Sequence, residues 1–241
     1  MRSLSVNLDH IATLRQARGT NYPSVVTAAG ICEIAGAHGI TLHLREDRRH
    51  IQDKDLALVS QVSLLPITLE MAPTDEMVNI AIQNKPQSVT LVPERRLEVT
   101  TEGGIDAIAE AAHIEPVIRK LEEAGIRTCL FLEPSKEQIQ KAYDLKVDAV
   151  ELHTGRYSEL FDDKSASYTV ELQRIEAAVE FGKSLNLKMN AGHGLHYQNI
   201  QPIASISNLD EFSIGHSIIS RSIFVGLERA ISEMASLIKL G

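Results

Sequence analysis

Polar side chains that could bind an anion or move a proton alternate along the stretch 40–45. Thr41, His43 and Arg45 share one face of this predicted strand, and apolar residues occupy the other face, because side chains alternate across a strand. A strand flanked by helices is normally apolar on both faces. A polar face that ends in His43 and Arg45 therefore predicts a cavity, open to solvent, that holds an anionic ligand.

Glu70 is the candidate general base. It is a lone carboxylate near the end of the otherwise apolar stretch 66–71, where burial would raise its pKa toward neutral, the range that a base at pH 7 needs. His43 and His193 are candidate proton shuttles. An ion pair with Arg45 is the alternative, and it would lower the pKa of Glu70 instead. No lysine ends a predicted strand, so any amine in the reaction should come from the substrate rather than from an enzyme-bound Schiff base.

Two glycine-rich turns are candidate phosphate sites. The turn 191–194 contains Gly192 and Gly194, and Gly215 and His216 begin the last predicted helix. Glycine lets backbone N–H groups approach an anion closely, and the N-terminus of a helix favours phosphate. The alternative is that these are ordinary turn glycines.

The charged turn after residue 44 could bind a second anionic group. Arg45 is suited to bidentate contact with a phosphate. For Arg48 and Arg49 we favour a solvated turn, with Glu46 and Asp47 as local partners.

The elements that must position these residues repeat eight times as strand then helix. Eight such units predict an α/β fold, a single (β/α)8 TIM barrel with extra short helices in its loops and one domain over residues 1–241. An open doubly wound sheet is the alternative, but it does not predict polar inward residues on nearly every strand. The expected strands are 4–9, 40–45, 66–71, 88–92, 126–132, 149–153, 187–190 and 211–214; the expected helices include 23–36, 54–62, 74–84, 113–124, 135–145, 167–185 and 216–239.

A barrel of this class carries its active site at the carboxyl ends of the strands. The polar residues found there are Asn7, Asp9, His43, Arg45, Glu70, Glu133, Glu151, His153, Asn190, His193, Gly215 and His216. A packed interior does not tolerate so many titratable groups without a use for them. The connection 93–112 is long enough to act as a lid. Near the strand starts, Arg127, Lys188 and Glu211 favour a structural ion-pair network.

Composition narrows the function classes. The 241-residue chain has a net charge of −8, which argues against nucleic-acid or membrane-surface binding. Its two cysteines, Cys32 and Cys129, indicate neither a disulfide framework nor a thiolate zinc site. No signal peptide or membrane-spanning run is recognisable, so a soluble cytoplasmic protein is expected.

Long motifs over the whole chain resemble the pyridoxine 5′-phosphate synthase (PdxJ) family. They are the segments 6–15, 17–20, 43–51, 69–71, 91–96, 98–104, 153–155, 190–195 and 214–216. The segment 161–165 carries no family signature, and we attach no function to it.

The resemblance implies the ring-closing step of vitamin B6 synthesis. In that step 3-amino-2-oxopropyl phosphate condenses with 1-deoxy-D-xylulose 5-phosphate to give pyridoxine 5′-phosphate, phosphate and water. It also implies that Glu70 is a proton acceptor, His43 a second acid/base residue and His193 the proton donor. The substrate-binding residues that it implies are Asn7, Asp9, His10, Arg18, Arg45, His50, Thr100, Gly194, Gly215 and His216. It further implies no metal or organic cofactor, an octamer of barrels and a lid formed by the fourth loop.

Two other functions fit the same residues. A metal-dependent hydrolase or aldolase could use the cluster of His43, His50, His153, His193, Glu70 and Glu151. Against it, no His-x-His ends the first strand, where Asn7 and Asp9 stand instead. The second alternative is a non-catalytic sensor of sugar phosphates.

Overall fold

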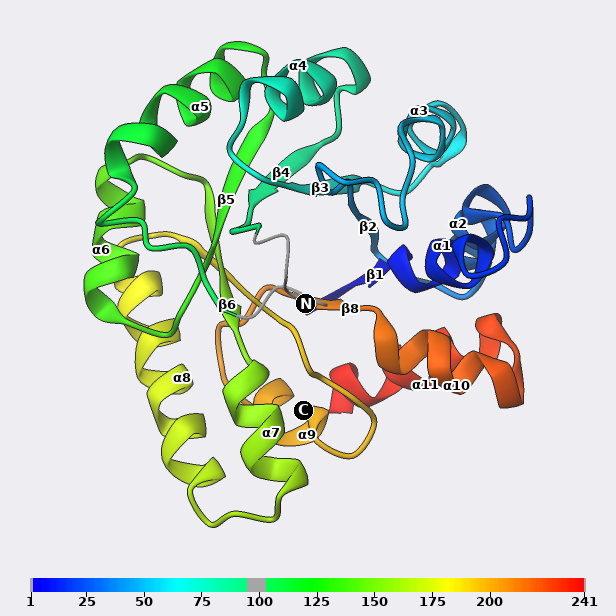
Figure 1. Cartoon of the computed structure of the whole chain (residues 1–241). Coiled ribbons are helices and arrows are strands. Elements are labelled where there is room, and N and C mark those ends of the chain that lie inside the picture. Colours follow the sequence, from blue (N-terminus) through cyan, green and yellow to red (C-terminus); the bar gives the residue numbers. More distant parts are fainter. Residues whose placement is uncertain (1, 95–102, 241) are drawn as a thin grey trace.

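Eight parallel strands close into a barrel in sequence order. The computed structural model describes residues 2–94 and 103–240. The last strand pairs with the first, with Val6 opposite Ile214, and this pairing closes the cylinder (Figure 1). The expected (β/α)8 barrel is therefore confirmed, and the open-sheet alternative is wrong. The strands are β1 Ser3–Asn7, β2 Gly39–His43, β3 Ile67–Met71, β4 Ser88–Leu91, β5 Arg127–Leu132, β6 Ala149–His153, β7 Lys188–Gly192 and β8 Glu211–Ile214.

Helices surround the barrel, and their bounds follow the expected ranges closely. They are α1 Asp9–Gln16, α2 Val25–Ile34, α3 Asp53–Val62, α4 Asp75–Asn84, α5 Ala111–Glu123, α6 Lys136–Asp144, α7 Gly155–Asp162, α8 Tyr168–Ser184, α9 Ile200–Ala204, α10 His216–Val225 and α11 Leu227–Leu240. Of these, α1 and α7 directly follow β1 and β6, and they are extra short helices of the expected kind. The single helix expected over 216–239 is two helices, because Gly226, with φ of +83°, ends α10.

Local sequence signals explain where several helices begin. The hydroxyls of Ser24, Thr74 and Ser135 accept hydrogen bonds from backbone N–H groups in the first turns of α2, α4 and α6. Such caps satisfy N–H groups that the helix leaves unpaired. The three hydroxyls therefore mark where α2, α4 and α6 begin.

The alternation along β2 sorts side chains as the sequence predicts. Ile40 and Leu42 are fully buried in the apolar layer between strands and helices. Thr41 points into the barrel, where its Oγ1 lies 2.7 Å from Ser5 Oγ and 3.3 Å from Ser213 Oγ. The barrel interior is polar at this level, and one strand end after another adds a polar side chain above it.

The expected ion-pair network at the barrel floor is wrong. Glu211 accepts a hydrogen bond from Ser3 Oγ at 3.2 Å. Arg127 and Lys188 are exposed, and across residues 2–94 and 103–240 neither forms a salt bridge within 4.0 Å. Their positive charges act on Glu211 only from a distance, where they oppose the rise in its pKa that burial causes.

Two features bear on the composition arguments. Cys32 and Cys129 are both buried and unbridged. None of the helices in the described ranges is both long enough and apolar enough to cross a bilayer.

Candidate functional site

A cavity of about 1100 Å³ opens at the carboxyl ends of the strands. It brings together most of the residues predicted for the site: Asn7, Asp9, His10, His43, Arg45, His50, Glu70, His193, Gly194, Gly215 and His216. Three candidates from the strand ends are not among its lining: Glu133, His153 and Asn190. The same holds for Arg18, which the family resemblance implies as a substrate-binding residue. Arg18 is exposed beyond the end of α1. Thr100 lies outside the described residues, as does the whole segment 95–102 of the predicted lid.

Glu70 lies at the end of β3, beside His43 at the end of β2. The strand register pairs the two residues, and Glu70 Oε2 lies 3.7 Å from His43 Nδ1. Burial raises the pKa of Glu70 well above its usual value, and the carboxyl groups of Glu151 and Asp9 add to the effect. The alternative of an Arg45 ion pair required a lowered pKa and is therefore wrong. Burial therefore favours the neutral form of the Glu70 carboxyl group.

Glu94 is a site residue that the sequence argument missed. Its Oε1 lies 3.0 Å from His43 Nε2, and its Oε2 accepts a hydrogen bond from the Glu46 backbone N–H at 3.1 Å. Burial opposes ionisation of Glu94, but the hydrogen bonds from His43 and Glu46 outweigh it, so its pKa is lowered. Glu94 follows the 88–92 stretch much as Glu133 follows 126–132, and this spacing could have identified it.

The Glu94 carboxylate selects one tautomer of His43. A carboxylate accepts hydrogen bonds, so His43 donates its Nε2–H to Glu94 and keeps a lone pair on Nδ1. That lone pair lies on the side of the Glu70 carboxyl group, whose Oε2 is 3.7 Å from Nδ1. The three side chains therefore form a line along which a proton can move in either direction.

Asn7 and Asp9 position His43 through its backbone. The His43 N–H donates to Asp9 Oδ1 at 2.8 Å, while Asn7 Nδ2 donates to Asp9 Oδ2 at 2.9 Å. Ligand atoms of Asp9, His43 and Glu70 lie within 4.8 Å of one another, which would fit a metal ion. Both Asp9 oxygens already accept hydrogen bonds and burial raises the pKa of Glu70, so this donor set is poorly prepared for a cation.

The cavity lining contains three further histidines, His10, His50 and His216. The rings of His10 and His216 lie 5.0 Å apart, and those of His43 and His50 lie 6.0 Å apart. Burial lowers the pKa of both His10 and His50. The Ile51 N–H donates to His50 Nδ1 at 2.9 Å, so neutral His50 carries its proton on Nε2. Such a ring can donate one hydrogen bond to a phosphate oxygen.

The N-terminus of α10 is built for an anion. Gly215 precedes the helix and no side chain caps its first turn, so N–H groups of that turn are available to a ligand in the cavity. A Cβ on Gly215 would lie 2.9 Å from the Asn7 side chain. A glycine is therefore required where α10 approaches β1.

The turn after β7 uses its two glycines differently. Gly194 has φ of +76° and lines the cavity, and a Cβ there would lie 2.7 Å from Ser158 Cβ. Gly192 instead leaves room for a carboxyl group, because its Cβ would lie 2.1 Å from Glu151 Oε1. Only Gly194 of the two therefore fits the predicted role beside an anion.

His193 stands between these glycines in a conformation that is unusual for its residue type. Its φ is +78°, and the Thr154 hydroxyl lies 2.6 Å from its carbonyl oxygen. A non-glycine residue in this region carries backbone strain, which is common at functional sites. Burial lowers the pKa of His193 to about 4, and the charge of nearby His153 adds to the effect.

The three arginines of the loop after β2 have different surroundings, and Arg45 is the one beside the cavity, as the sequence favoured. Arg45 is buried beside the cavity, with its Nε 4.0 Å from Glu94 Oε2. Arg49 pairs with Asp47 at 2.7 Å. Arg48 pairs instead with Asp53 and Glu76, from α3 and α4, so its partner residues differ from those expected.

The cavity lining contains a second contact that the sequence argument did not find. His196 Nε2 lies 2.9 Å from Asp162 Oδ1, and both side chains line the cavity. Asp162 belongs to the segment 161–165, to which the sequence assigned no function. The sequence indicates Asp162 only through its position in the connection between β6 and α8.

Fold and site together define a class of protein. A closed (β/α)8 barrel brings buried carboxyl groups, neutral imidazoles, an arginine and a helix N-terminus to one cavity at its catalytic face. This combination is typical of an enzyme that performs acid–base chemistry on phosphorylated small molecules.

Comparison with known proteins identifies the family. The family described as pyridoxal phosphate biosynthesis protein PdxJ matches residues 4–240. Pyridoxine 5′-phosphate synthase of Trichlorobacter lovleyi is 52% identical over 239 residues, 99% of each chain, and that of Syntrophotalea carbinolica is 50% identical over 238 residues, again 99% of each chain. The chain belongs to the PdxJ family and is an enzyme of vitamin B6 biosynthesis.

Solved structures support the fold alone. The 3-keto-L-gulonate-6-phosphate decarboxylase of Vibrio cholerae has a TM-score of 0.63 at 12% identity, covering 99% of this chain and 97% of its own. KGPDC of Streptococcus mutans has a TM-score of 0.65 at 12% identity, covering 99% and 98%. Both resemblances agree with the barrel described above.

Proposed function

We propose that this enzyme condenses 3-amino-2-oxopropyl phosphate with 1-deoxy-D-xylulose 5-phosphate to give pyridoxine 5′-phosphate, phosphate and water. The observation that carries the proposal is that Glu70, His43 and His193 face one cavity beside the N-terminus of α10. Membership of the PdxJ family and relatives named pyridoxine 5′-phosphate synthase support the same reaction. The proposed chemistry uses no metal or organic cofactor.

Glu70 is the proposed proton acceptor. Burial raises its pKa and so favours its neutral form, and a substrate that carries an ammonium group would supply the opposite charge that favours its ionised form. Glu70 can lose its proton toward the His43 Nδ1 lone pair, and the carboxylate can then take a proton from the ammonium. The freed amine is the nucleophile that attacks a ketone to form an imine.

His193 is the proposed proton donor. Forming an imine and losing hydroxyl or phosphate groups each require a proton on the leaving oxygen. His193 and Glu70 both line the cavity, so a substrate between them can lose a proton to one and gain a proton from the other. The enclosed site limits competing reaction with water.

Two anion sites would hold the two phosphorylated substrates. One is formed by the N-terminus of α10 with Gly194, Gly215 and His216; the other is formed by Arg45 and His50. Asn7, Asp9 and His10 complete the proposed binding set. Arg18 and Thr100 remain proposed ligands by resemblance to the family.

A two-substrate turnover assay with mass identification of the product tests the reaction. We expect pyridoxine 5′-phosphate and inorganic phosphate in equal amounts, and no product when either substrate is omitted. Binding of both substrates without turnover would contradict the proposal and favour the sensor alternative.

The alternative of a metal-dependent enzyme can be tested, because ligand atoms of Asp9, His43 and Glu70 lie close together. If the enzyme depended on a divalent metal, purified protein would contain stoichiometric metal and chelator would abolish turnover. We expect full activity after chelator treatment, because both Asp9 oxygens accept hydrogen bonds without a cation and burial favours the neutral form of Glu70.

We also propose that the enzyme acts in the cytoplasm as a homo-oligomer, an octamer by family resemblance. Large apolar side chains of the α1–α2 region and α10 are exposed, including Tyr22, Ile223 and Phe224. A second copy of the chain could bury them. Light scattering on the purified protein tests this, and a monomer at micromolar concentration would contradict it.

A further inference from the structure

A second layer of titratable groups lies behind His193, outside the lining of the cavity. Glu133 follows β5, and its Oε1 lies 2.7 Å from Nδ1 of His153, the last residue of β6. The His153 ring lies 5.0 Å from the His193 ring, at an interplanar angle of 53°. Glu133, His153 and His193 therefore form a row that leads from the side of the barrel to the cavity.

One atom of this row has no partner. His153 Nε2 is buried, and no described residue forms a hydrogen bond with it. An unpaired buried polar atom is rare and calls for an explanation. The ring is held in place on its other side, because Phe131 packs against it edge-on at 5.3 Å and Glu133 fixes Nδ1.

Gly155 shows that both rings face one small space. A Cβ on Gly155 would lie 2.5 Å from His153 Nε2 and 3.0 Å from His193 Cδ2. Gly155 is the first residue of α7 and has no positive φ, so the helix itself does not require a glycine here. The missing side chain leaves the two imidazoles open to each other.

We propose that His153, held by Glu133, is the positioning residue that stores a proton for His193 and returns it between proton-donation steps. This inference rests on the proposed function, in which His193 is the proton donor. His153 does not touch the substrate and acts only through His193.

The proposed step moves one proton and breaks no other bond. His193 gives a proton to a leaving oxygen and becomes neutral. Protonated His153 then transfers the proton on Nε2 to His193 and becomes the neutral tautomer with its proton on Nδ1, still donating to the Glu133 carboxylate. Solvent protons restore His153 while the site is open.

The surrounding charges favour a single proton shared by the two rings. Hydrogen bonding from His153 lowers the pKa of Glu133 despite burial, so a carboxylate is available to stabilise a protonated His153. Arg174, on α8, lies 3.7 Å from the other Glu133 oxygen. Burial and the charge of His153 both disfavour a proton on His193, so His193 needs a nearby donor at neutral pH.

The groups that face His153 come from three directions. Glu133 faces it from β5, His193 from the turn after β7, and Arg174 of α8 acts through Glu133. On its own strand, Glu151 is a buried acid two residues earlier.

Three variants test the proposal: His153→Ala, Glu133→Gln and Gly155→Ala. We expect kcat to fall about 10- to 100-fold in His153→Ala, with both KM values within twofold of wild type. This loss is smaller than the roughly 100- to 10,000-fold typical of a group that transfers protons with the substrate directly, because His153 acts only through His193. Added imidazole should restore activity to His153→Ala, and a series of substituted imidazoles should restore it according to their basicity. Gly155→Ala keeps the helix but separates the rings, and it should lower kcat without rescue by imidazole.

Nuclear magnetic resonance of labelled imidazoles gives a readout that does not need turnover. His193 should titrate at higher pH in His153→Ala than in the wild type, because no second ring competes for the proton. Glu133→Gln should move it in the same direction by less. His113→Asn, which removes an exposed histidine of α5, should leave both kcat and the His193 titration unchanged.

The outcomes separate this inference from the proposed function. If the wild type has no turnover, the proposed function fails, yet the His193 titration still decides whether the two rings share a proton. If wild type turns over but His153→Ala keeps kcat or leaves the His193 titration unmoved, the inference is overturned. A folded His153→Ala with reduced kcat and no imidazole rescue would also overturn it, since that pattern indicates a structural role; circular dichroism and thermal melting establish the fold.

Discussion

Glu94 orients His43 through a hydrogen bond of 3.0 Å to Nε2. Glu94→Gln removes the negative charge and permits the other tautomer, in which the His43 proton is on Nδ1 and faces Glu70. We expect kcat to fall about 10- to 100-fold with smaller changes in KM. This is less than the roughly 100- to 10,000-fold typical of a direct acid–base group, because Glu94 acts through His43.

Steady-state kinetics at fixed pH measure this effect. Glu46→Gln is the matched control, because that side chain is exposed and only its backbone N–H contacts Glu94. Equal kcat values in Glu94→Gln and wild type would contradict the role assigned to Glu94.

Glu151 makes stability depend on pH in a definite direction. Burial, with a contribution from Glu211, raises the pKa of this carboxyl group to about 8. Between its ordinary pKa and 8 the folded protein binds a proton that the unfolded chain has lost, so the free energy of unfolding falls as pH rises through this window. Glu151→Gln removes the ionisable group, so its stability should fall less between pH 5 and pH 8.

Denaturant titration at these two pH values measures the difference. The slope for one such group is about 1.4 kcal/mol per pH unit, so a difference on the order of a few kcal/mol is expected. Glu180→Gln, at an exposed position of α8, should behave as wild type. Parallel pH dependence in Glu151→Gln and wild type would show that Glu151 titrates normally.

At this scale, alternation along the strands predicts much of the site. It identifies His43, Glu70 and His193 because each stands at or just after the end of an apolar stretch, and the structure brings all three to the cavity. Alternation does not predict which side chains contact one another. Glu94, Asp162 and the Gly192–Glu151 contact depend on loop paths and close approaches that no local pattern records.

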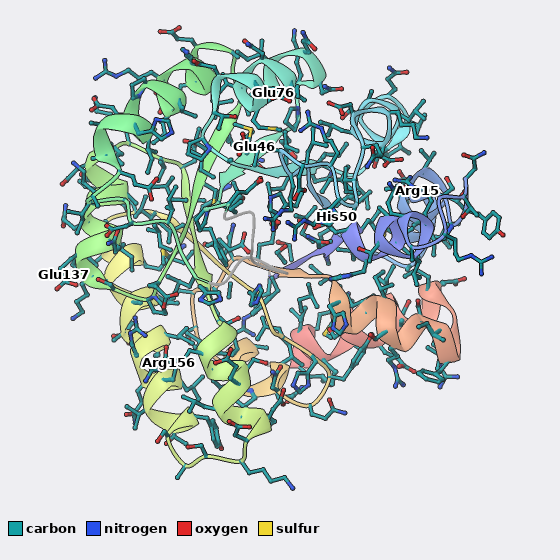
Figure 2. The ribbon with its side chains drawn as sticks, viewed as in Figure 1. Arg15, Glu46, His50, Glu76, Glu137 and Arg156 are labelled. Carbon is teal, nitrogen blue, oxygen red and sulfur yellow. The ribbon has the colours of Figure 1, made fainter. Side chains whose placement is uncertain are left out.

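Among the elements, α1 is joined to the first turn of α3 by a buried ion pair. Arg15 and Asp55 form two hydrogen bonds of 2.7 Å, and Arg15 Nη2 donates to the His50 carbonyl at 3.1 Å. Figure 2 labels Arg15, on α1, and His50, in the loop before α3. The pair therefore fixes the backbone that presents His50 to the cavity.

Breaking this pair should weaken both stability and binding. Asp55→Ala leaves a buried arginine without its carboxylate, and we expect a loss of about 3 to 5 kcal/mol in the free energy of unfolding. Glu115→Ala breaks an exposed pair with Arg119 and should cost less than about 1 kcal/mol. Chemical denaturation compares the two, and similar small losses would contradict the structural role of the buried pair.

Helix positions follow from the sequence better than helix breaks do. Capping residues such as Ser24 and Thr74 begin α2 and α4 where the pattern predicts. The break between α10 and α11 was missed because apolar spacing continues across Gly226. The helix α1 was missed because arginine and glycine residues between 15 and 19 favoured a loop over the preceding turn.

For the whole molecule, eight repeated strand–helix units predict the barrel because parallel strands with right-handed crossovers close at that number. Closure then brings the ends of β1, β2, β3, β6, β7 and β8 to one cavity, although they are spread over more than 200 residues. The sequence does not reveal how the barrels assemble, since the exposed apolar side chains on α10 do not determine which surface would cover them.

The central claim is that Glu70 moves protons within a cavity that binds both phosphorylated substrates. Its most direct test compares Glu70→Gln with wild type and with the exposed control Glu180→Gln, measuring kcat and, by calorimetry, the affinity for each substrate. The account predicts that kcat falls about 100- to 10,000-fold in Glu70→Gln alone, while both affinities stay within a few fold of wild type. Wild-type kcat in Glu70→Gln would contradict it.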